Sequence, residues 1–176
     1  MQNHPEYPQR RSIRLPEYDY SSQGAYFVTL VTNQWQNLFG AIKETNVKLS
    51  KLGLIVHKEW IRSAQIRSEM KIHEDEFVIM PNHLHGIVWF QSPENGKLPI
   101  DDANSNLYRK PKTLGSFIAG FKSSVTRIAT QELGISKVWQ RNYYEHVIRD
   151  DADWERIVLY IQENPRKWSE DRLFHQ

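Results

Sequence analysis

Residues 25–32, AYFVTLVT, form an apolar and β-branched run that constrains the fold more than any other stretch of the chain. In this run both the odd and the even positions carry mostly apolar side chains, so both faces of the strand are apolar. This pattern is typical of a strand that is covered on both faces of a sheet. Similar runs end at Met80 and span 83–90, with a turn at Pro81–Asn82 between them. We therefore expect a central sheet with a layer packed on each face.

Periodic patterns predict the elements that surround these strands. Apolar residues at helical spacing predict three helices, at 50–64, at 113–132 and from Asp150 to the residue before Pro165. Alternating patterns predict a short strand at 38–43 and another at 138–149. Helices and strands mix without the regular alternation of a doubly wound sheet. The predicted fold class is α+β, a sandwich in which helices pack on a mostly antiparallel sheet.

The chain has 176 residues, the size of one domain with a substantial core. We expect residues 25–176 to form this domain and the polar residues 1–24 to form an irregular N-terminal arm. No cysteine is present, so disulfides, thiolate zinc sites and cysteine nucleophiles are excluded. No apolar run approaches the ~20 residues of a membrane span, and the N-terminus lacks the apolar core of a signal peptide. We therefore expect a cytoplasmic protein without membrane contacts.

Two histidines flank a leucine in the stretch His83–Leu84–His85. Side chains at i and i+2 of a strand point to the same face, so this pair projects two imidazoles side by side. The pattern predicts half of a metal site, although a pair of partly solvated polar residues would give the same spacing. Gly86 follows directly and leaves space in which the backbone of a ligand can approach.

Tyr160 and Asn164 lie four residues apart on the last predicted helix and so share a face. If that face opposes the histidine pair, the Asn164 oxygen is a third ligand and the Tyr160 phenol is a nucleophile beside the metal. Two imidazoles and an amide oxygen with open positions for phosphate suit Mg²⁺ or Mn²⁺. Alternatively, Tyr160 is one aromatic among many and Asn164 is simply a helix-terminal residue. Tyr143 and Tyr144 are rival nucleophiles, for which core packing or base stacking is the other interpretation.

Several motifs together resemble the REP-associated tyrosine transposases, which are related to the single-tyrosine HUH transposases of insertion sequences. The resemblance covers nearly the whole chain in order. The motifs that carry it are Arg11-Ser12-Ile13-Arg14-Leu15, Gly24-Ala25-Tyr26-Phe27-Val28-Thr29, Met80-Pro81-Asn82-His83-Leu84-His85-Gly86, Gly120-Phe121-Lys122-Ser123, residues 138–149 (VWQRNYYEHVIR) and Tyr160-Ile161-Gln162-Glu163-Asn164-Pro165.

This resemblance implies a ferredoxin-like fold and a metal-dependent endonuclease and strand transferase. The implied substrate is single-stranded or hairpin DNA at repetitive extragenic palindromes (REP sequences), cleaved through a covalent phosphotyrosine. His83 and His85 match the family's metal ligands, and Tyr160 matches its nucleophile. Asn164 matches the third ligand, where related insertion-sequence transposases commonly have glutamine. The implied cofactor is Mg²⁺ or Mn²⁺, and the implied location is the nucleoid.

The family also recognises a short tetranucleotide beside the hairpin. Charge and placement suggest six residues for such DNA contacts, namely Arg10, Arg11, Arg14, Lys122, Gln140 and Arg141. An alternative function is a catalytically silent protein that keeps the fold and binds hairpin DNA. The sequence leaves open whether the protein is a monomer or a homodimer, and whether Tyr160 meets the histidines within one chain.

Overall fold

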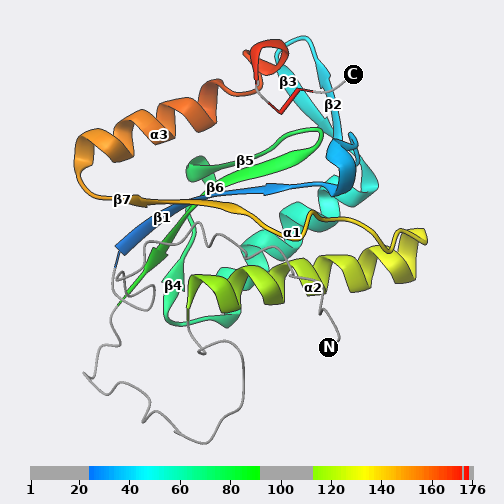
Figure 1. Ribbon diagram of the computed structural model, residues 1–176, viewed down its shortest axis with the longest axis horizontal. Helices are drawn as coiled ribbons and strands as arrows, with labels where there is room; N and C mark the ends of the chain where they lie inside the picture. Colours follow the sequence, from blue (N-terminus) through cyan, green and yellow to red (C-terminus); the bar gives the residue numbers. More distant parts are fainter. Residues whose placement is uncertain (1–23, 92–112, 172, 175–176) are drawn as a thin grey trace, which may run out of the picture.

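The computed structural model describes residues 24–91, 113–171 and 173–174. Within these residues, five strands form one sheet in the order β4-β6-β1-β7, with β5 also paired to β6, and every pairing is antiparallel (Figure 1). The strands are β1 (Gly24–Val31), β4 (Met70–Lys71), β5 (Phe77–Ile79), β6 (His83–Phe90) and β7 (Tyr144–Ile148). A separate hairpin pairs β2 (Gly40–Lys43) with β3 (Asn46–Leu49).

Helices cover both faces of the sheet (Figure 1). α1 (Lys51–Ile66) and α2 (Leu114–Leu133) pack on one face, and α3 (Asp151–Glu163) lies over the other. Short 3₁₀ turns are η1 (Asn33–Trp35), η2 (Glu74–Glu76) and η3 (Trp168–Glu170). The predicted α+β sandwich is confirmed, and so is the ferredoxin-like arrangement that the resemblance implied. None of the described helices is long and apolar enough to cross a membrane.

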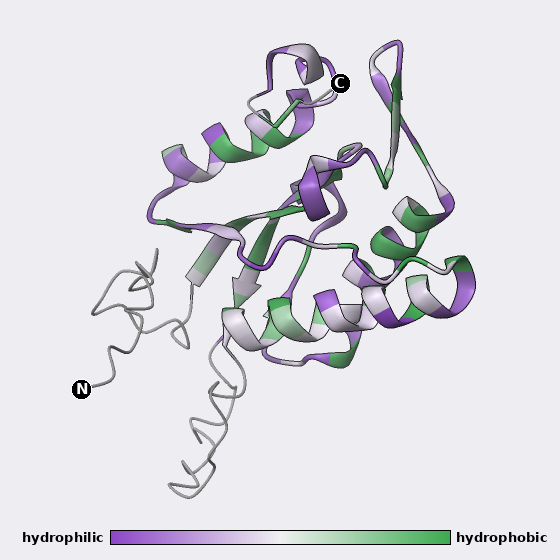
Figure 2. Ribbon diagram, turned by 45° about the vertical axis from the view of Figure 1, so that its right-hand side comes forward, coloured by the Kyte–Doolittle hydropathy of each residue, from purple (hydrophilic) through white to green (hydrophobic). Residues whose placement is uncertain are grey.

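Alternation along the strands divides the core into two unequal parts. Tyr26, Val28 and Leu30 point toward α1 and α2, where the larger apolar cluster lies. The smaller cluster under α3 consists of Ala25, Phe27, Ile87, Ile157 and Ile161. Apolar residues, green in Figure 2, follow the strands between the helices. Because apolar packing fills only part of the space beneath α3, this face has room for the polar side chains of a site.

The structure differs from the predicted strand at 138–149. Trp139 makes only an isolated bridge to Thr32, and β7 begins at Tyr144. The carbonyls of Gln140 and Asn142 accept hydrogen bonds from Lys122 instead of entering a ladder. The predicted short strand at 38–43 corresponds to β2, but its partner β3 was not predicted.

Gly86 faces the α1 side of the sheet, not a ligand, so the interpretation of this glycine from sequence is wrong. A Cβ at this position would lie 2.8 Å from Cζ2 of Trp60 and 3.1 Å from the Cβ of Phe77. Both neighbours are held by packing, and Trp60 is fully buried. The glycine therefore allows an indole to lie against the strand directly behind the histidine pair.

Replacing Gly86 by alanine is expected to destabilise the protein by about 1–3 kcal/mol, because the added methyl overpacks the core. Urea denaturation would measure the change in the free energy of unfolding. Gly120→Ala is the matched control, since the nearest atom to its new methyl is a guanidinium nitrogen of Arg67 at 3.7 Å. In that exposed helical position alanine is expected to stabilise the protein by about 0.5–1 kcal/mol. Equal effects of the two substitutions would contradict the packing argument.

Candidate functional site

β6 carries the two histidines side by side on the face covered by α3. His83 and His85 are 0% and 2% exposed, and their ring centroids lie 4.3 Å apart. The Nδ1 atom of each ring is already engaged. Nδ1 of His83 lies 2.8 Å from Oδ1 of Asn82, and Nδ1 of His85 lies 2.8 Å from the hydroxyl of Thr29. In each ring it is therefore Nε2, and not Nδ1, that is placed to act as a ligand.

His83 is a neutral imidazole at physiological pH. Burial lowers the pKa of His83 to about 4, although the carboxylate of Asp171 and the side chain of Asn164 act in the opposite direction. Among the described residues, Nε2 of His83 is buried and has no hydrogen-bond partner. A neutral ring with a free nitrogen lone pair is the form of histidine that binds a metal ion.

α3 brings the predicted nucleophile to these histidines within one chain. The Tyr160 hydroxyl oxygen lies 3.2 Å from Nε2 of His85, and the two ring centroids are 5.1 Å apart. The Tyr160 ring also meets Phe27 edge to face at 6.1 Å, and the residue is 44% exposed. The phenol thus stands at the boundary between the small core and solvent, where a substrate can reach it.

Asn164 caps the end of α3 and is 3% exposed. Its Nδ2 donates to Oδ2 of Asp171 at 2.8 Å. Its Oδ1 is buried and has no hydrogen-bond partner in the part of the chain that the structure describes. The amide is therefore held through its nitrogen while its oxygen remains available as a ligand.

Asp171 is a site residue that the sequence did not suggest. After α3 the chain passes through η3 and turns back, so that His83, His85 and Asp171 each present a ligand atom within 4.8 Å of the others. Its Oδ1 accepts from the backbone N–H of Leu173 at 2.7 Å. In the sequence Asp171 is simply an acidic residue beyond Pro165, outside any periodic element. Such a position does not predict that its carboxylate lies close to the histidines.

The residues present fit a divalent metal ion. Buried polar atoms without a partner are costly, and His83 Nε2 and Asn164 Oδ1 are two such atoms in one cluster. Two imidazoles, an amide oxygen and a carboxylate offer a mixed set of nitrogen and oxygen donors of the kind that binds divalent metal ions. The cluster of His83, His85 and Asp171 can therefore bind a metal.

Comparison with known proteins identifies relatives of this chain. No protein-family model matches it. An uncharacterized protein of Haemophilus influenzae is 43% identical over 169 residues, which cover 94% of this chain and 93% of that protein. The two chains belong to one family.

A REP-associated tyrosine transposase of Escherichia coli K12 is 26% identical over 103 residues, or 58% of this chain. The matched segment covers 50% of the length of that transposase. A solved structure of a REP-associated tyrosine transposase bound to a REP hairpin superposes with a TM-score of 0.60 at 19% identity, covering 91% of this chain and 77% of the other. The predicted resemblance to the REP-associated tyrosine transposases is confirmed.

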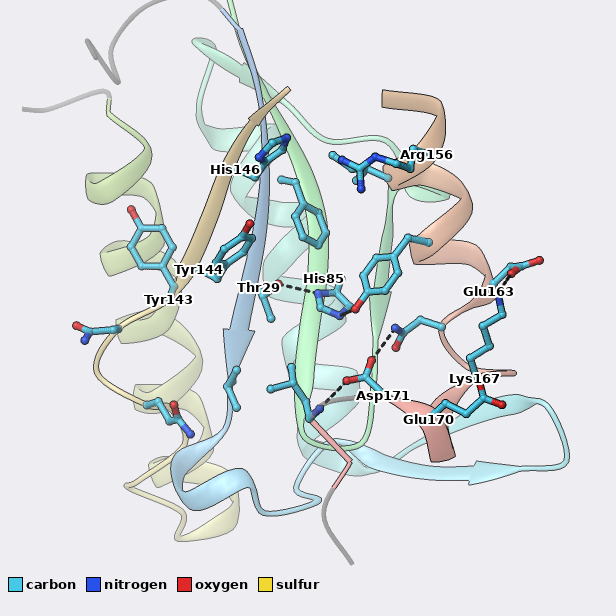
Figure 3. Close-up of a pocket in the computed structure, with 18 residues that line it drawn as sticks. Thr29, His85, Tyr143, Tyr144, His146, Arg156, Glu163, Lys167, Glu170 and Asp171 are labelled. Carbon is cyan, nitrogen blue, oxygen red and sulfur yellow. Dashed lines mark hydrogen bonds and ion pairs between the residues drawn. The ribbon is translucent and has the colours of Figure 1, made fainter. Parts of the chain in front are cut away.

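On this transposase-like fold, a cleft of about 920 Å³ opens between the face of β1 and β7 and the side of α3 (Figure 3). His85 and Asp171 lie in the middle of the view, with Tyr143 and Tyr144 on one side and Arg156 and Lys167 on the other. Tyr144 is 54% exposed and its ring meets Phe27 at 6.3 Å. The cleft combines aromatic side chains, cations and the candidate metal ligands.

The candidates for DNA contacts fall in different places. Gln140 lines the cleft, and Arg141 is exposed next to it. Lys122 is partly buried, and its Nζ donates to the carbonyls of Gln140 and Asn142, each at 2.9 Å. The ring centroids of Trp139 and Tyr143 lie 5.9 and 6.0 Å from the same Nζ atom. The remaining candidates, Arg10, Arg11 and Arg14, lie outside the described residues.

Lys122 therefore shapes one wall of the cleft, and its titration is expected to affect stability. Burial lowers the pKa of Lys122 from 10.5 to about 8. Between these pH values the unfolded chain keeps a proton that the folded chain has released, so the free energy of unfolding rises with pH. A neutral amine still has two N–H donors for the two carbonyls.

We expect this gain to reach about 1–3 kcal/mol between pH 8 and pH 10.5 and to be absent in Lys122→Met. Urea denaturation of both proteins across this range would measure it, because other titrating groups cancel in the difference. A difference in unfolding free energy that stays constant with pH would contradict the prediction.

Proposed function

We propose that this protein is a metal-dependent endonuclease and strand transferase of single-stranded DNA. It acts at hairpin, REP-like sequences through a covalent 5′-phosphotyrosine intermediate. The observation that carries the proposal is the 3.2 Å approach of the Tyr160 hydroxyl to Nε2 of His85, within a cluster that contains two unpartnered ligand atoms. This contact places the proposed nucleophile beside the proposed metal ligands.

His83, His85, Asn164 and Asp171 are the residues that would hold the ion. A bound divalent ion would polarise the scissile phosphate and stabilise the charge that develops on it. This help matters because a phenol has a pKa near 10 and attacks poorly when it is protonated. The proposal accordingly requires Mg²⁺ or Mn²⁺ for cleavage.

In the proposed step the Tyr160 oxygen attacks the phosphorus and forms a P–O bond to it. The bond between the phosphorus and the 3′ oxygen of the preceding nucleotide breaks. The phenol gives up a proton and the departing 3′ oxygen takes one up. The product keeps one phosphoester bond for the one broken, so a different 3′-hydroxyl can reverse the step and join two strands.

The side chains that line the cleft favour single-stranded DNA as the substrate. The exposed ring of Tyr144 offers a surface on which an unpaired base can stack, and stacking tolerates any base. Gln140 and Arg141 are proposed to contact the DNA at the edge of the cleft, while Lys122 holds the backbone of that segment. The solved transposase of similar fold is bound to a REP hairpin, which favours a hairpin with single-stranded flanks as the natural form of the DNA.

A labelled hairpin oligonucleotide with randomised single-stranded flanks tests the proposal. After incubation with Mn²⁺ and denaturation, a 3′ label is expected to migrate with the protein and a 5′ label is expected on a free fragment. This asymmetry follows because the phosphotyrosine attaches the protein to the 5′ end of the downstream piece. Chelation of the metal is expected to abolish both products.

The alternative is a hairpin-binding protein without turnover. Retention of the hairpin in a binding assay that weakens steeply with salt, without adduct under any metal, would favour this alternative and overturn the enzymatic proposal. The complete set of Tyr160, His83, His85 and Asn164 favours the enzyme.

A further inference from the structure

Asn82 directly precedes the histidine pair in the sequence, and its side chain makes hydrogen bonds to three separate parts of the chain. It is 0% exposed. Its Nδ2 donates to the backbone carbonyl of Trp35 at 3.2 Å and to that of Leu173 at 2.6 Å. Its Oδ1 lies 2.8 Å from Nδ1 of His83. Asn82 thus connects the loop after β1, the start of β6 and the C-terminal segment.

The two carbonyls determine which way the amide points. Carbonyl oxygens only accept, so the side of Asn82 that faces them must be its NH₂ group, and a flipped amide would bring three oxygens together. The amide oxygen is then turned toward His83 and can only accept a hydrogen bond. Nδ1 of His83 must therefore carry the proton, and Nε2 must carry the lone pair.

The position of the Trp35 carbonyl is maintained against a local backbone preference. Gln34 and Trp35 both adopt the left-handed region, each with φ of 54°. Non-glycine residues rarely occupy this region, and two in succession indicate a conformation imposed by surrounding contacts. The strained turn directs the Trp35 carbonyl toward Asn82.

We propose that Asn82 is a positioning residue that holds His83 in the Nδ1–H tautomer, so that Nε2 presents its lone pair to the metal site. This inference rests on the proposed function for its purpose but concerns a property of the metal-free protein. Through the Leu173 carbonyl, Asn82 also anchors the segment that carries Asp171. One buried amide thereby sets two of the proposed ligands.

The tautomer can be measured without metal or DNA. The full-length protein labelled with ¹⁵N-histidine would be studied near neutral pH by long-range ¹H–¹⁵N correlation, with the His83 signals assigned from the spectrum of His83→Gln. We expect Nδ1 of His83 to give the signal of a protonated nitrogen and Nε2 that of a nitrogen lone pair. A proton on Nε2 in the wild-type protein would overturn the inference.

Two variants separate the roles of the amide. Asn82→Leu has similar size but no hydrogen-bonding groups, so His83 is expected to populate the Nε2–H tautomer and Mn²⁺ affinity to fall by about 10- to 100-fold. Asn82→Asp keeps an acceptor beside His83 but turns a second oxygen toward the two carbonyls, so it is expected to be less stable while its folded form retains the Nδ1–H tautomer. If neither variant folds, the wild-type spectrum still decides which nitrogen of His83 carries the proton.

Thr29→Val is the matched control, because it removes the hydroxyl beside His85 and leaves Asn82 in place. It is expected to leave the His83 tautomer unchanged. An unchanged tautomer in Asn82→Leu, or loss of the Nδ1–H tautomer in Asn82→Asp, would contradict the role of the amide oxygen. Failure to form a DNA adduct with the tautomer as expected would refute the proposed function and leave this inference standing.

Discussion

Replacing Tyr160 by phenylalanine is expected to reduce covalent adduct formation by roughly 10⁴-fold or more, because the only atom removed is the proposed nucleophile. The ring contacts with Phe27 and His85 do not require the hydroxyl, so the fold is expected to remain intact. Denaturing gel electrophoresis with a 3′-labelled hairpin would quantify the adduct. Circular dichroism and hairpin binding would verify that the variant is folded.

Tyr144→Phe is the matched control for this prediction. Tyr144 lines the same cleft and is similarly exposed, but its phenol is not the one that faces His85 Nε2. If Tyr144 stacks on a base, the phenylalanine retains the ring and the adduct persists. Loss of the adduct in Tyr144→Phe with full activity in Tyr160→Phe would reverse the assignment of the nucleophile.

Removing a histidine ligand is expected to have the second largest effect. His85→Ala should lower Mn²⁺ affinity by at least about 100-fold, since one of few donors disappears and water must replace it. Isothermal titration calorimetry without DNA would measure the affinity. Mn²⁺ should also raise the melting temperature of the wild-type protein but not that of the variant. Equal affinities of the two proteins would show that the metal binds elsewhere.

Asp171→Asn tests whether the carboxylate belongs to the same metal site. We expect the Mn²⁺ affinity to fall by about 10- to 100-fold, because a charged donor is lost and the contact that holds Asn164 changes. Glu170→Gln is the control, since it removes a neighbouring exposed charge that also lines the cleft. Similar small losses in both variants would indicate a general effect of charge and not coordination.

Local periodicity predicted much of the fold because its causes lie in neighbouring residues. The alternation in β1 and the apolar stripe of α2 reflect which side chains each element buries. Asp150, where the last predicted helix begins, caps α3 by accepting a hydrogen bond from the N–H of Asp153 at 2.8 Å. The prediction was wrong at 138–143, where the side chain of Lys122, remote in sequence, binds the carbonyls that a strand would have used.

The candidate site, like the fold, was predicted from the sequence only where its geometry is local. The spacing of His83 and His85, and that of Tyr160 and Asn164, determined that each pair would share a face, since strand and helix geometry is local. Whether the two faces meet depended on the packing of α3 across β1 and β6, through a small cluster that includes Phe27 and Ile157. The resemblance to a family suggested this meeting, and periodicity did not.

The sequence by itself determined the central strands, the helices and the residues that each of these elements can present to a site. Only the tertiary structure brought Asp171 to the histidines, turned the Asn82 amide toward His83 and placed Trp60 against Gly86. These contacts join segments through turns and irregular backbone, where no repeat in the sequence records the distance between two side chains. Periodic spacing describes a face of one element, whereas a metal site depends on how several faces close on one another.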